Sequence, residues 1–226
     1  MTRILLIRHC EAEGNIKRLF QGHTDADISE NGERQLLRLA ERCKDMELDF
    51  LYSSPLIRAQ KTARAAGTHH DLPLKLDPGL MEINGGVWEG KAWSSFPLLY
   101  PEQARRWNLS PWEFHPEGGE SMRELHKRIW NTIIAIARRH TGSTVGIVSH
   151  GCAIRNFLCR AHGYPIEKLN EISWSDNTGI SIIDFDAEMK PEVLLENDAS
   201  HLSDELSTLG KQTWWRPETR AAMIFE

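Results

Sequence analysis

Near the start of the chain, a short apolar run is followed at once by two side chains that can bind or attack a phosphate group. The run covers residues 4–7, and Arg8 and His9 come next. Its length and branched side chains are typical of a strand that is buried on both faces of a sheet. An arginine offers a planar fork of donors to phosphate, and a histidine can be a nucleophile or proton carrier near neutral pH. Taken alone, the pair could equally end a strand in solvent.

The same arrangement recurs twice further along the chain. An apolar run at 144–148 is followed by Ser149 and His150, and the apolar residues 50–51 precede a segment that contains Arg58. The carboxyl ends of parallel strands form one edge of a sheet, and ligands bind there. We therefore expect two histidines and two arginines to meet at this edge. Phosphoryl transfer needs such a set, with a nucleophile in line and donors around the phosphoryl oxygens.

At these residues the chain resembles the histidine phosphatase superfamily, the phosphoglycerate mutase-like proteins. Four motifs in the family's order carry the resemblance over roughly residues 1–200, which makes it specific although each motif alone is weak. They are Arg8-His9-Cys10, the segment 53–63 (SSPLIRAQKTA), Glu82 with the block 85–90 (GGVWEG), and Ser149-His150-Gly151. The segment 116–121 (PEGGES) is similar to the α-ribazole phosphatase and broad-specificity phosphatase branch.

The resemblance implies a catalytic role for five side chains. His9 would attack phosphorus and form a phosphohistidine. Arg8 and Arg58 would hold the phosphoryl oxygens, and a protonated His150 would add a further donor. Glu82 would be the general acid that protonates the leaving alkoxide and then the base that activates water.

Three further positions match family positions that contact the phosphate or the substrate, namely Asn15, Gln21 and Gly22. The scheme requires no metal ion and no other cofactor, because the arginines and histidines neutralise the phosphate. The resemblance therefore implies a metal-independent phosphomonoesterase that acts on a small phosphorylated metabolite.

One residue departs from the family pattern. Cys10 stands where the family usually has glycine, and Cys152 lies two residues beyond His150. Glycine is common where backbone must pass close to a ligand. Our hypothesis at this stage is that both thiols flank the phosphate pocket and make the activity sensitive to oxidation.

Size and charge exclude several other classes of protein. With 226 residues, 40% of them hydrophobic and 26% charged, the chain suits one soluble domain with a large core. The net charge of −5 argues against nucleic-acid binding, for which a basic excess is expected. No apolar run is long enough to cross a membrane and no signal peptide precedes the first strand, so we expect a cytoplasmic protein. A homodimer is possible.

Alternating strand and helix patterns predict a three-layer α/β/α sandwich with a mostly parallel central sheet. A tryptophan- and proline-rich insertion at about 78–118 is expected to form a lid with short helices. We assign 1–200 to the phosphatase domain, and 201–226, with Trp214 and Trp215, to a tail packed on the domain or on a partner. The expected strands are 4–7, 48–52, 72–76, 144–148, 177–185 and 192–196, with a hairpin between the last two, and the expected helices are 29–44, 54–66, 122–139 and 151–161.

Two other functions stay open on the sequence alone. One is a cofactor-dependent phosphoglycerate mutase, since Arg105 and Arg106 in the insertion are similar to a mutase pair that grips the substrate carboxylate. The other is a non-catalytic phospho-ligand or protein-binding module, which Trp214 and Trp215 would favour.

Overall fold

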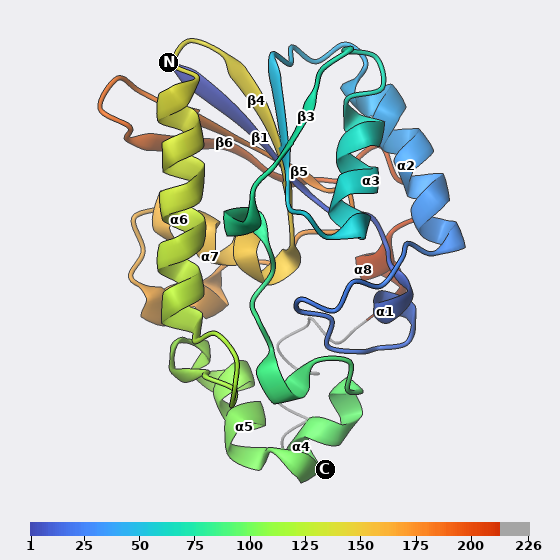
Figure 1. The fold of residues 1–226 in the computed structure, drawn as a ribbon, viewed down its shortest axis with the longest axis vertical. Helices are drawn as coiled ribbons and strands as arrows, with labels where there is room; N and C mark the ends of the chain where they lie inside the picture. Colours follow the sequence, from blue (N-terminus) through green and yellow to red (C-terminus); the bar gives the residue numbers. More distant parts are fainter. Residues whose placement is uncertain (213–226) are drawn as a thin grey trace.

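The computed structural model describes residues 1–212, which form a six-stranded sheet flanked by helices (Figure 1). The strands are β1 (Thr2–Arg8), β2 (Phe50–Ser53), β3 (Leu74–Leu76), β4 (Thr144–Ser149), β5 (Ile180–Phe185) and β6 (Pro191–Asp198). The helices are α1 (Glu13–Ile16), α2 (Glu30–Cys43), α3 (Ile57–Ala66), α4 (Phe96–Leu99), α5 (Pro101–Leu109), α6 (Met122–Arg139), α7 (Gly151–Ala161) and α8 (Thr208–Lys211).

The strand order is β3-β2-β4-β1-β5-β6, so the first strand of the chain lies inside the sheet. β1, β2, β3 and β4 pair in parallel. β5 runs antiparallel to β1 and forms the predicted hairpin with β6. The mostly parallel sheet is thus confirmed, and the carboxyl ends of β1, β2 and β4 lie together at one edge.

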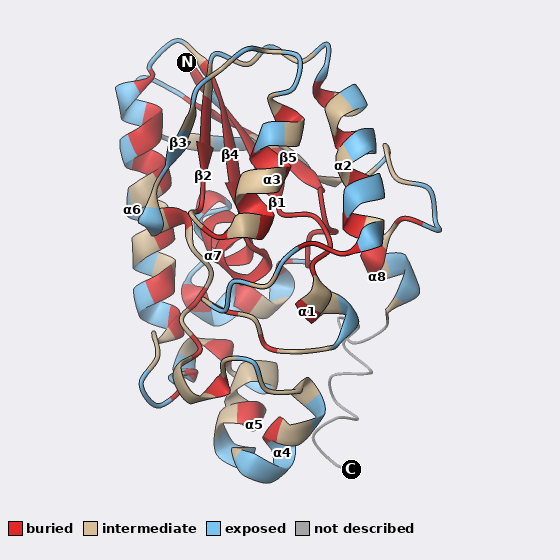
Figure 2. Cartoon of the chain, turned by 45° about the vertical axis from the view of Figure 1, so that its right-hand side comes forward, coloured by how far each residue is buried: buried red, intermediate tan, exposed pale blue. Residues whose placement is uncertain are grey.

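Helices cover both faces of the sheet, which confirms the three-layer prediction. Figure 1 shows α6 and α7 on one side of the sheet and α2 and α3 on the other. Successive side chains of a strand point to opposite faces, and β1 follows this rule: Ile4 and Leu6 pack in the core under α6 and α7, while Leu5 and Ile7 pack in the core under α2 and α3. Figure 2 shows the resulting buried sheet between helices that are exposed on their outer sides.

Local hydrogen bonds set the ends of several helices. Ser29 caps α2 by accepting a hydrogen bond from the Gly32 amide, and Ser121 and Glu124 form a reciprocal capping box at the start of α6. Such caps satisfy amides that the first turn leaves without partners.

The predicted start of α3 at Ser54 and Pro55 is wrong, because the helix begins at Ile57 with Leu56 as its N-cap. The Ser54 amide still bonds to the carbonyl oxygen of Val148 in β4 (3.0 Å), so Ser54 continues the strand.

The insertion between β3 and α6 forms short helices beyond the carboxyl edge of the sheet, as predicted (Figure 1). Besides α4 and α5 it contains the 3-10 helices Pro78–Leu80, Gly86–Trp88, Trp93–Ser95 and Pro111–Glu113; a further one, Ile166–Glu171, follows α7. Trp88, Phe96 and Phe114 are buried inside it. These aromatic residues belong to the same hydrophobic core as Ile4 and Leu6 of β1, so the insertion packs onto the body of the protein.

The chain after β6 returns to the body of the protein. The Leu206 carbonyl accepts a hydrogen bond from Gln35 of α2 (2.7 Å), and the buried Thr208 hydroxyl donates to Glu11 (3.0 Å). The domain boundary at residue 200 stays a prediction, and Trp214 and Trp215 lie outside the described residues. Among residues 1–212, every helix is too short or too polar to span a membrane.

Candidate active site

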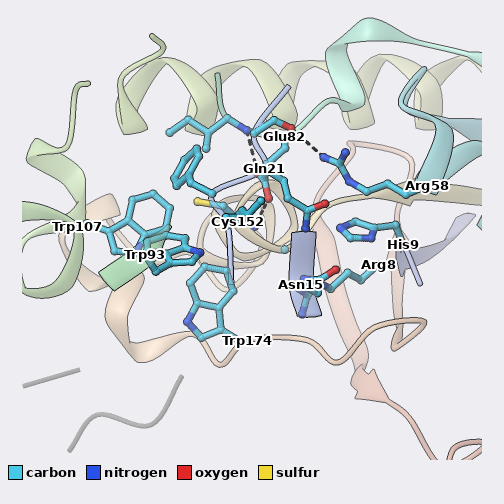
Figure 3. A pocket seen from close by; sticks show the side chains of 15 residues that line it. Arg8, His9, Asn15, Gln21, Arg58, Glu82, Trp93, Trp107, Cys152 and Trp174 are labelled. Atoms are coloured by element: carbon cyan, nitrogen blue, oxygen red, sulfur yellow. Dashed lines mark hydrogen bonds between the residues drawn. The ribbon is translucent and has the colours of Figure 1, made fainter. Parts of the chain in front are cut away.

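A half-open cavity lies at the carboxyl edge of the sheet, between the strand ends and the insertion. Figure 3 shows that its lining has two unlike sides. The first, which we call the polar end, consists of Arg8, His9, Asn15, Arg58 and Glu82. The second, which we call the aromatic wall, consists of Phe20, Trp93, Trp107 and Trp174.

His9 follows β1 directly, and its backbone amide bonds to the Ser149 carbonyl oxygen of β4 (3.0 Å). Its ring Nδ1 lies 2.6 Å from the carbonyl oxygen of Cys10. A carbonyl can only accept, so Nδ1 carries the proton and Nε2 keeps its lone pair. Burial, followed by the nearby Arg58 and Arg8, lowers the pKa of His9 well below its usual value. The imidazole is therefore neutral at physiological pH, as a nucleophile must be.

Two buried arginines flank His9. Arg8 donates from Nη1 to the Ser175 carbonyl oxygen (2.5 Å), and Arg58 donates from Nη1 and Nη2 to the Thr24 and Gly22 carbonyl oxygens, both at 2.8 Å. Burial lowers the pKa of Arg8 and brings that of Arg58 to about 10, so both stay charged near neutral pH.

These two charges are left incompletely paired within the described part of the chain. The Nε–H groups of Arg8 and Arg58 are buried and have no hydrogen-bond partner there. The ion pairs found among residues 1–212 include neither guanidinium. A buried charge without a partner is costly, and an anionic ligand between the two would offset that cost.

His150 is the N-cap of α7, and its ring centre lies 5.0 Å from that of His9. Its Nε2 is 2.8 Å from the Ser54 hydroxyl. In the free site, burial and the neighbouring Arg58 lower the pKa of His150 well below the usual value. Its role as a protonated donor concerns the site with phosphate bound and stays a prediction. The ring is fully buried behind His9 and does not line the cavity itself.

Glu82 lies in the insertion, and the start of α7 holds it in place. Its Oε2 accepts from the Cys152 amide (2.9 Å), and its Oε1 accepts from the amides of Ala153 (3.0 Å) and Ile83 (2.9 Å). These amides fix the carboxyl group at the cavity. The structure thus brings together all five predicted catalytic residues, with His150 in contact with His9 and the others in the lining.

The three predicted substrate-binding residues also line the cavity. The Asn15 side chain accepts from the Ala12 amide (2.9 Å) and so closes the first turn of α1. The Gln21 Oε1 is buried with no partner among the described residues. Gly22 has a φ of +46°, and a Cβ there would lie 2.1 Å from Oε1 of Glu89. Only glycine fits at this position.

Glu89 is a residue whose role the sequence did not reveal. Its two carboxylate oxygens accept four hydrogen bonds, from the amides of His23 (2.9 Å), Thr24 (2.8 Å) and Gly85 (2.8 Å) and from the Thr24 hydroxyl (2.6 Å). The loop that it holds supplies the carbonyl oxygens that orient Arg58. Its place within the tryptophan-glutamate-glycine block was visible, but the direction of its side chain was not.

Comparison with known proteins decides the family. The sequence model of the histidine phosphatase superfamily (branch 1) matches residues 4–199. The chain belongs to this superfamily. Phosphoserine phosphatase 1 of Hydrogenobacter thermophilus is 32% identical over 90% of this chain and 96% of its own length.

Two solved structures show the same fold in this superfamily. YhfR of Bacillus stearothermophilus superposes with a TM-score of 0.86 at 30% identity, covering 90% of this chain and all of the other. A putative α-ribazole-5'-P phosphatase of Escherichia coli gives a TM-score of 0.79 at 25% identity, covering 87% of this chain and 96% of the other. The predicted resemblance to the α-ribazole phosphatase branch is thus confirmed, and the named relatives support a phosphatase enzyme.

The cysteines of this superfamily member differ from our expectation. Cys10 does not line the cavity; it is fully buried, and its amide donates to the Thr62 hydroxyl (2.9 Å). Cys152 does line it. Burial raises the pKa of Cys10 to about 12 and that of Cys152 well above the usual value. Because Cys10 lies outside the lining, the prediction that both thiols flank the pocket is wrong. The raised pKa values favour the protonated thiols and so argue against sensitivity to oxidation.

The sequence predicted a tryptophan-rich insertion, but not which aromatic residues form the wall. Trp93 and Trp107 come from the insertion, but Phe20 follows α1 and Trp174 precedes β5. Three separate segments of the chain thus build one surface. No periodicity marks residues that meet in this way, and no pattern in the sequence pointed to Trp174.

Proposed function

We propose that the chain is a metal-independent phosphomonoesterase that hydrolyses a small phosphorylated metabolite through a phosphohistidine on His9. The observation that carries this proposal is a neutral His9, with its Nε2 lone pair kept, between two buried arginines that retain unused donors. A phosphate dianion placed there meets a nucleophile and charge-assisted donors at once.

In the first half of the reaction, Nε2 of His9 attacks phosphorus and the bond to the alcohol oxygen breaks. Glu82 gives its proton to the departing alkoxide. The Cys10 carbonyl oxygen keeps its hydrogen bond to Nδ1–H and stabilises the positive ring that forms. The dianion favours the protonated form of a nearby imidazole, so substrate binding would convert the neutral His150 into the predicted donor.

In the second half, Glu82 takes a proton from water, which attacks the phosphohistidine and releases inorganic phosphate. Arg8 and Arg58 bind the transferred oxygens in both halves and are placed before the reaction starts. Preorganised donors of this kind are usually the largest single contribution to such catalysis. They also neutralise the charge for which other phosphatases use metal ions, and this supports the metal-independent assignment.

A mutase would differ in the second half of the reaction. The phosphoryl group on His9 would pass to an acceptor hydroxyl rather than to water. Arg105 and Arg106 were its main support. Both form ion pairs with Glu102 (3.1 and 2.9 Å), and neither lines the cavity. The pair therefore offers no grip on a substrate carboxylate, which favours the phosphatase. The complete polar end likewise argues against a non-catalytic binding module.

The test is release of p-nitrophenol from p-nitrophenyl phosphate in the presence of a chelator. We expect turnover by the wild type and a loss of about 10³-fold or more in His9→Ala, with His69→Ala at an exposed position as the control. A chelator-sensitive reaction, or one that survives in His9→Ala, would overturn the proposal. Interconversion of phosphoglycerates, with 2,3-bisphosphoglycerate added and without phosphate release, would establish the mutase instead.

A further inference from the structure

The aromatic wall is a continuous surface of four rings. Phe20 lies 5.2 Å from Trp93 and 5.6 Å from Trp107, measured between ring centroids. Trp93 and Trp107 are 5.3 Å apart, and Trp107 stacks on Trp174 at 6.5 Å with 29° between the planes. Aromatic pairs at such separations attract one another beyond the area that they bury. The wall faces the polar end across the cavity (Figure 3).

A second layer of buried side chains fixes the wall. Behind the insertion side, Trp88 stacks on Phe96 at 3.8 Å with 14° between the planes, and both rings are 1% exposed. At the other side, the Arg155 guanidinium lies 4.4 Å from the Trp174 ring centre. Arg155 is held in turn by the carbonyl oxygens of Ile172 (2.9 Å) and Leu169 (2.7 Å). The wall is thus a preformed surface.

Charge is distributed unequally along the cavity. Among residues 1–212, the only cationic side chains in the lining are Arg8 and Arg58, and both belong to the polar end. If they bind the phosphoryl group, no lysine or arginine of the described lining remains for a second anion. In the described lining a carboxylate on the substrate would then meet only neutral side-chain donors, such as the amides of Asn15 and Gln21, beside Glu82 and the aromatic rings. Burying a carboxylate without a cationic partner is unfavourable.

We propose that this site selects phosphomonoesters whose alcohol carries a compact aromatic ring and no carboxylate, with the ring packed against Trp93 and Trp107. This inference rests on the proposed phosphatase function and names its substrate class. The cavity of about 90 Å³ is smaller than the roughly 150 Å³ cavity that admits benzene. The cavity must also hold the phosphoryl group, so the ring of the alcohol can lie only at its open side, and the remaining space suits a single ring rather than a larger fused system.

The experiment compares three esters of primary alcohols under one set of conditions, namely benzyl phosphate, ethyl phosphate and O-phospho-L-serine. We expect kcat/KM to fall in that order, with benzyl phosphate at least about tenfold above phosphoserine because of the unpaired carboxylate. Ethyl phosphate separates the effect of the ring from that of the carboxylate. A kcat/KM for phosphoserine equal to or above that for benzyl phosphate would overturn the inference.

Variants of Trp107 test whether the aromatic wall causes the preference for benzyl phosphate. Trp107→Leu is expected to lower the ratio of kcat/KM for benzyl phosphate to that for ethyl phosphate about tenfold, and Trp107→Phe should retain most of it. The matched control is Trp130→Leu, since Trp130 is a half-buried tryptophan that stacks on Phe157 outside the cavity. An unchanged ratio in Trp107→Leu would overturn the assignment of the wall.

Failure of folding, of the proposed phosphatase function and of the substrate class can be told apart. If Trp107→Leu does not fold, as judged by circular dichroism, the wild-type comparison and Trp107→Phe still decide the question. If none of the three esters releases phosphate, the proposed phosphatase function itself fails. If all three are hydrolysed without the expected order, only the substrate class fails.

Discussion

The two sides of the cavity differ in how the chain builds them. Side chains of the polar end mostly adjoin regular elements: Arg8 ends β1, His9 follows it, and Arg58 lies in the first turn of α3. The residues of the aromatic wall come from the insertion, from the irregular segment after α1 and from the one before β5. The sheet thus positions the proposed catalytic groups, while the proposed selectivity depends on segments that can change without disturbing the sheet.

The two sides also differ in their effect on the stability of the folded protein. Burial lowers the pKa values of the arginines and histidines here, namely Arg8, Arg58, His9 and His150. Positive charge at the polar end is therefore unfavourable before an anionic ligand binds. The aromatic wall buries apolar surface, which favours folding. We therefore expect variants of the polar end to affect every substrate, and variants of the wall to affect the choice among substrates.

After His9→Ala, the largest effect should come from Arg58→Lys. A lysine keeps the charge but loses the planar fork, and loss of one preorganised donor typically lowers kcat by about 10²–10³-fold. The fall in kcat/KM should be the same for benzyl and ethyl phosphate. Arg38→Lys, on the exposed face of α2, is the matched control. A change in the substrate ratio would contradict the division between the two sides.

Glu89→Gln should have the next largest effect. The amide nitrogen of glutamine cannot accept, so one side of the loop that orients Arg58 loses its partner. Small displacements of a catalytic group can cost up to about 10²-fold, and we expect kcat to fall about 10–100-fold with little change in KM. Steady-state kinetics with benzyl and ethyl phosphate would measure kcat and KM separately. The exposed Glu117→Gln is the control, and unchanged kcat in Glu89→Gln would reject the positioning role.

Stability should depend on pH through the buried histidines. The folded-state pKa values of His9 and His150 lie below the unfolded value of about 6.5. The unfolded state therefore binds more protons as the pH falls through that value, and the free energy of unfolding decreases by up to about 1.4 kcal/mol per pH unit for each group.

Urea unfolding between pH 7.5 and 5.5 would measure this loss. His9→Gln should make the dependence less steep, whereas the exposed His69→Gln should not. An equal slope in His9→Gln and the wild type would show that His9 is not held neutral in the folded protein.

The smallest effect is expected from oxidation. Because the thiols of Cys10 and Cys152 are buried and have raised pKa values, brief treatment with peroxide should leave the activity of the native protein within about twofold of its starting value. Thiol-reactive labelling of native and urea-unfolded protein, read by mass spectrometry, checks the cause. Rapid inactivation that Cys152→Ala prevents would contradict it.

The sequence allowed the fold and the polar end to be predicted because both depend on local patterns. Short apolar runs mark buried strands, and the polar residues that follow them must lie at the sheet edge. This argument located Arg8, His9 and His150. Glu82 required the family motif, since it stands in an irregular segment.

Other features could not be predicted because they depend on side-chain directions. Glu89 was part of a recognised motif, yet its four donors come from two loops. Trp174 meets Trp107 across 67 positions of the chain without a periodic signal. The state of His150 depends on burial next to Arg58, which is a property of the assembled site.

The place of β1 inside the sheet has a consequence for synthesis. β1 carries His9 at its end, and both of its partner strands, β4 and β5, begin at residue 144 or later. At roughly 5–20 residues per second on the ribosome, on the order of 10 s pass before β1 can pair. During that time an apolar segment stays exposed. The strand that leads to the proposed nucleophile is the first to be made and among the last to be protected. Chaperones that shield nascent apolar strands should therefore affect the yield of this protein.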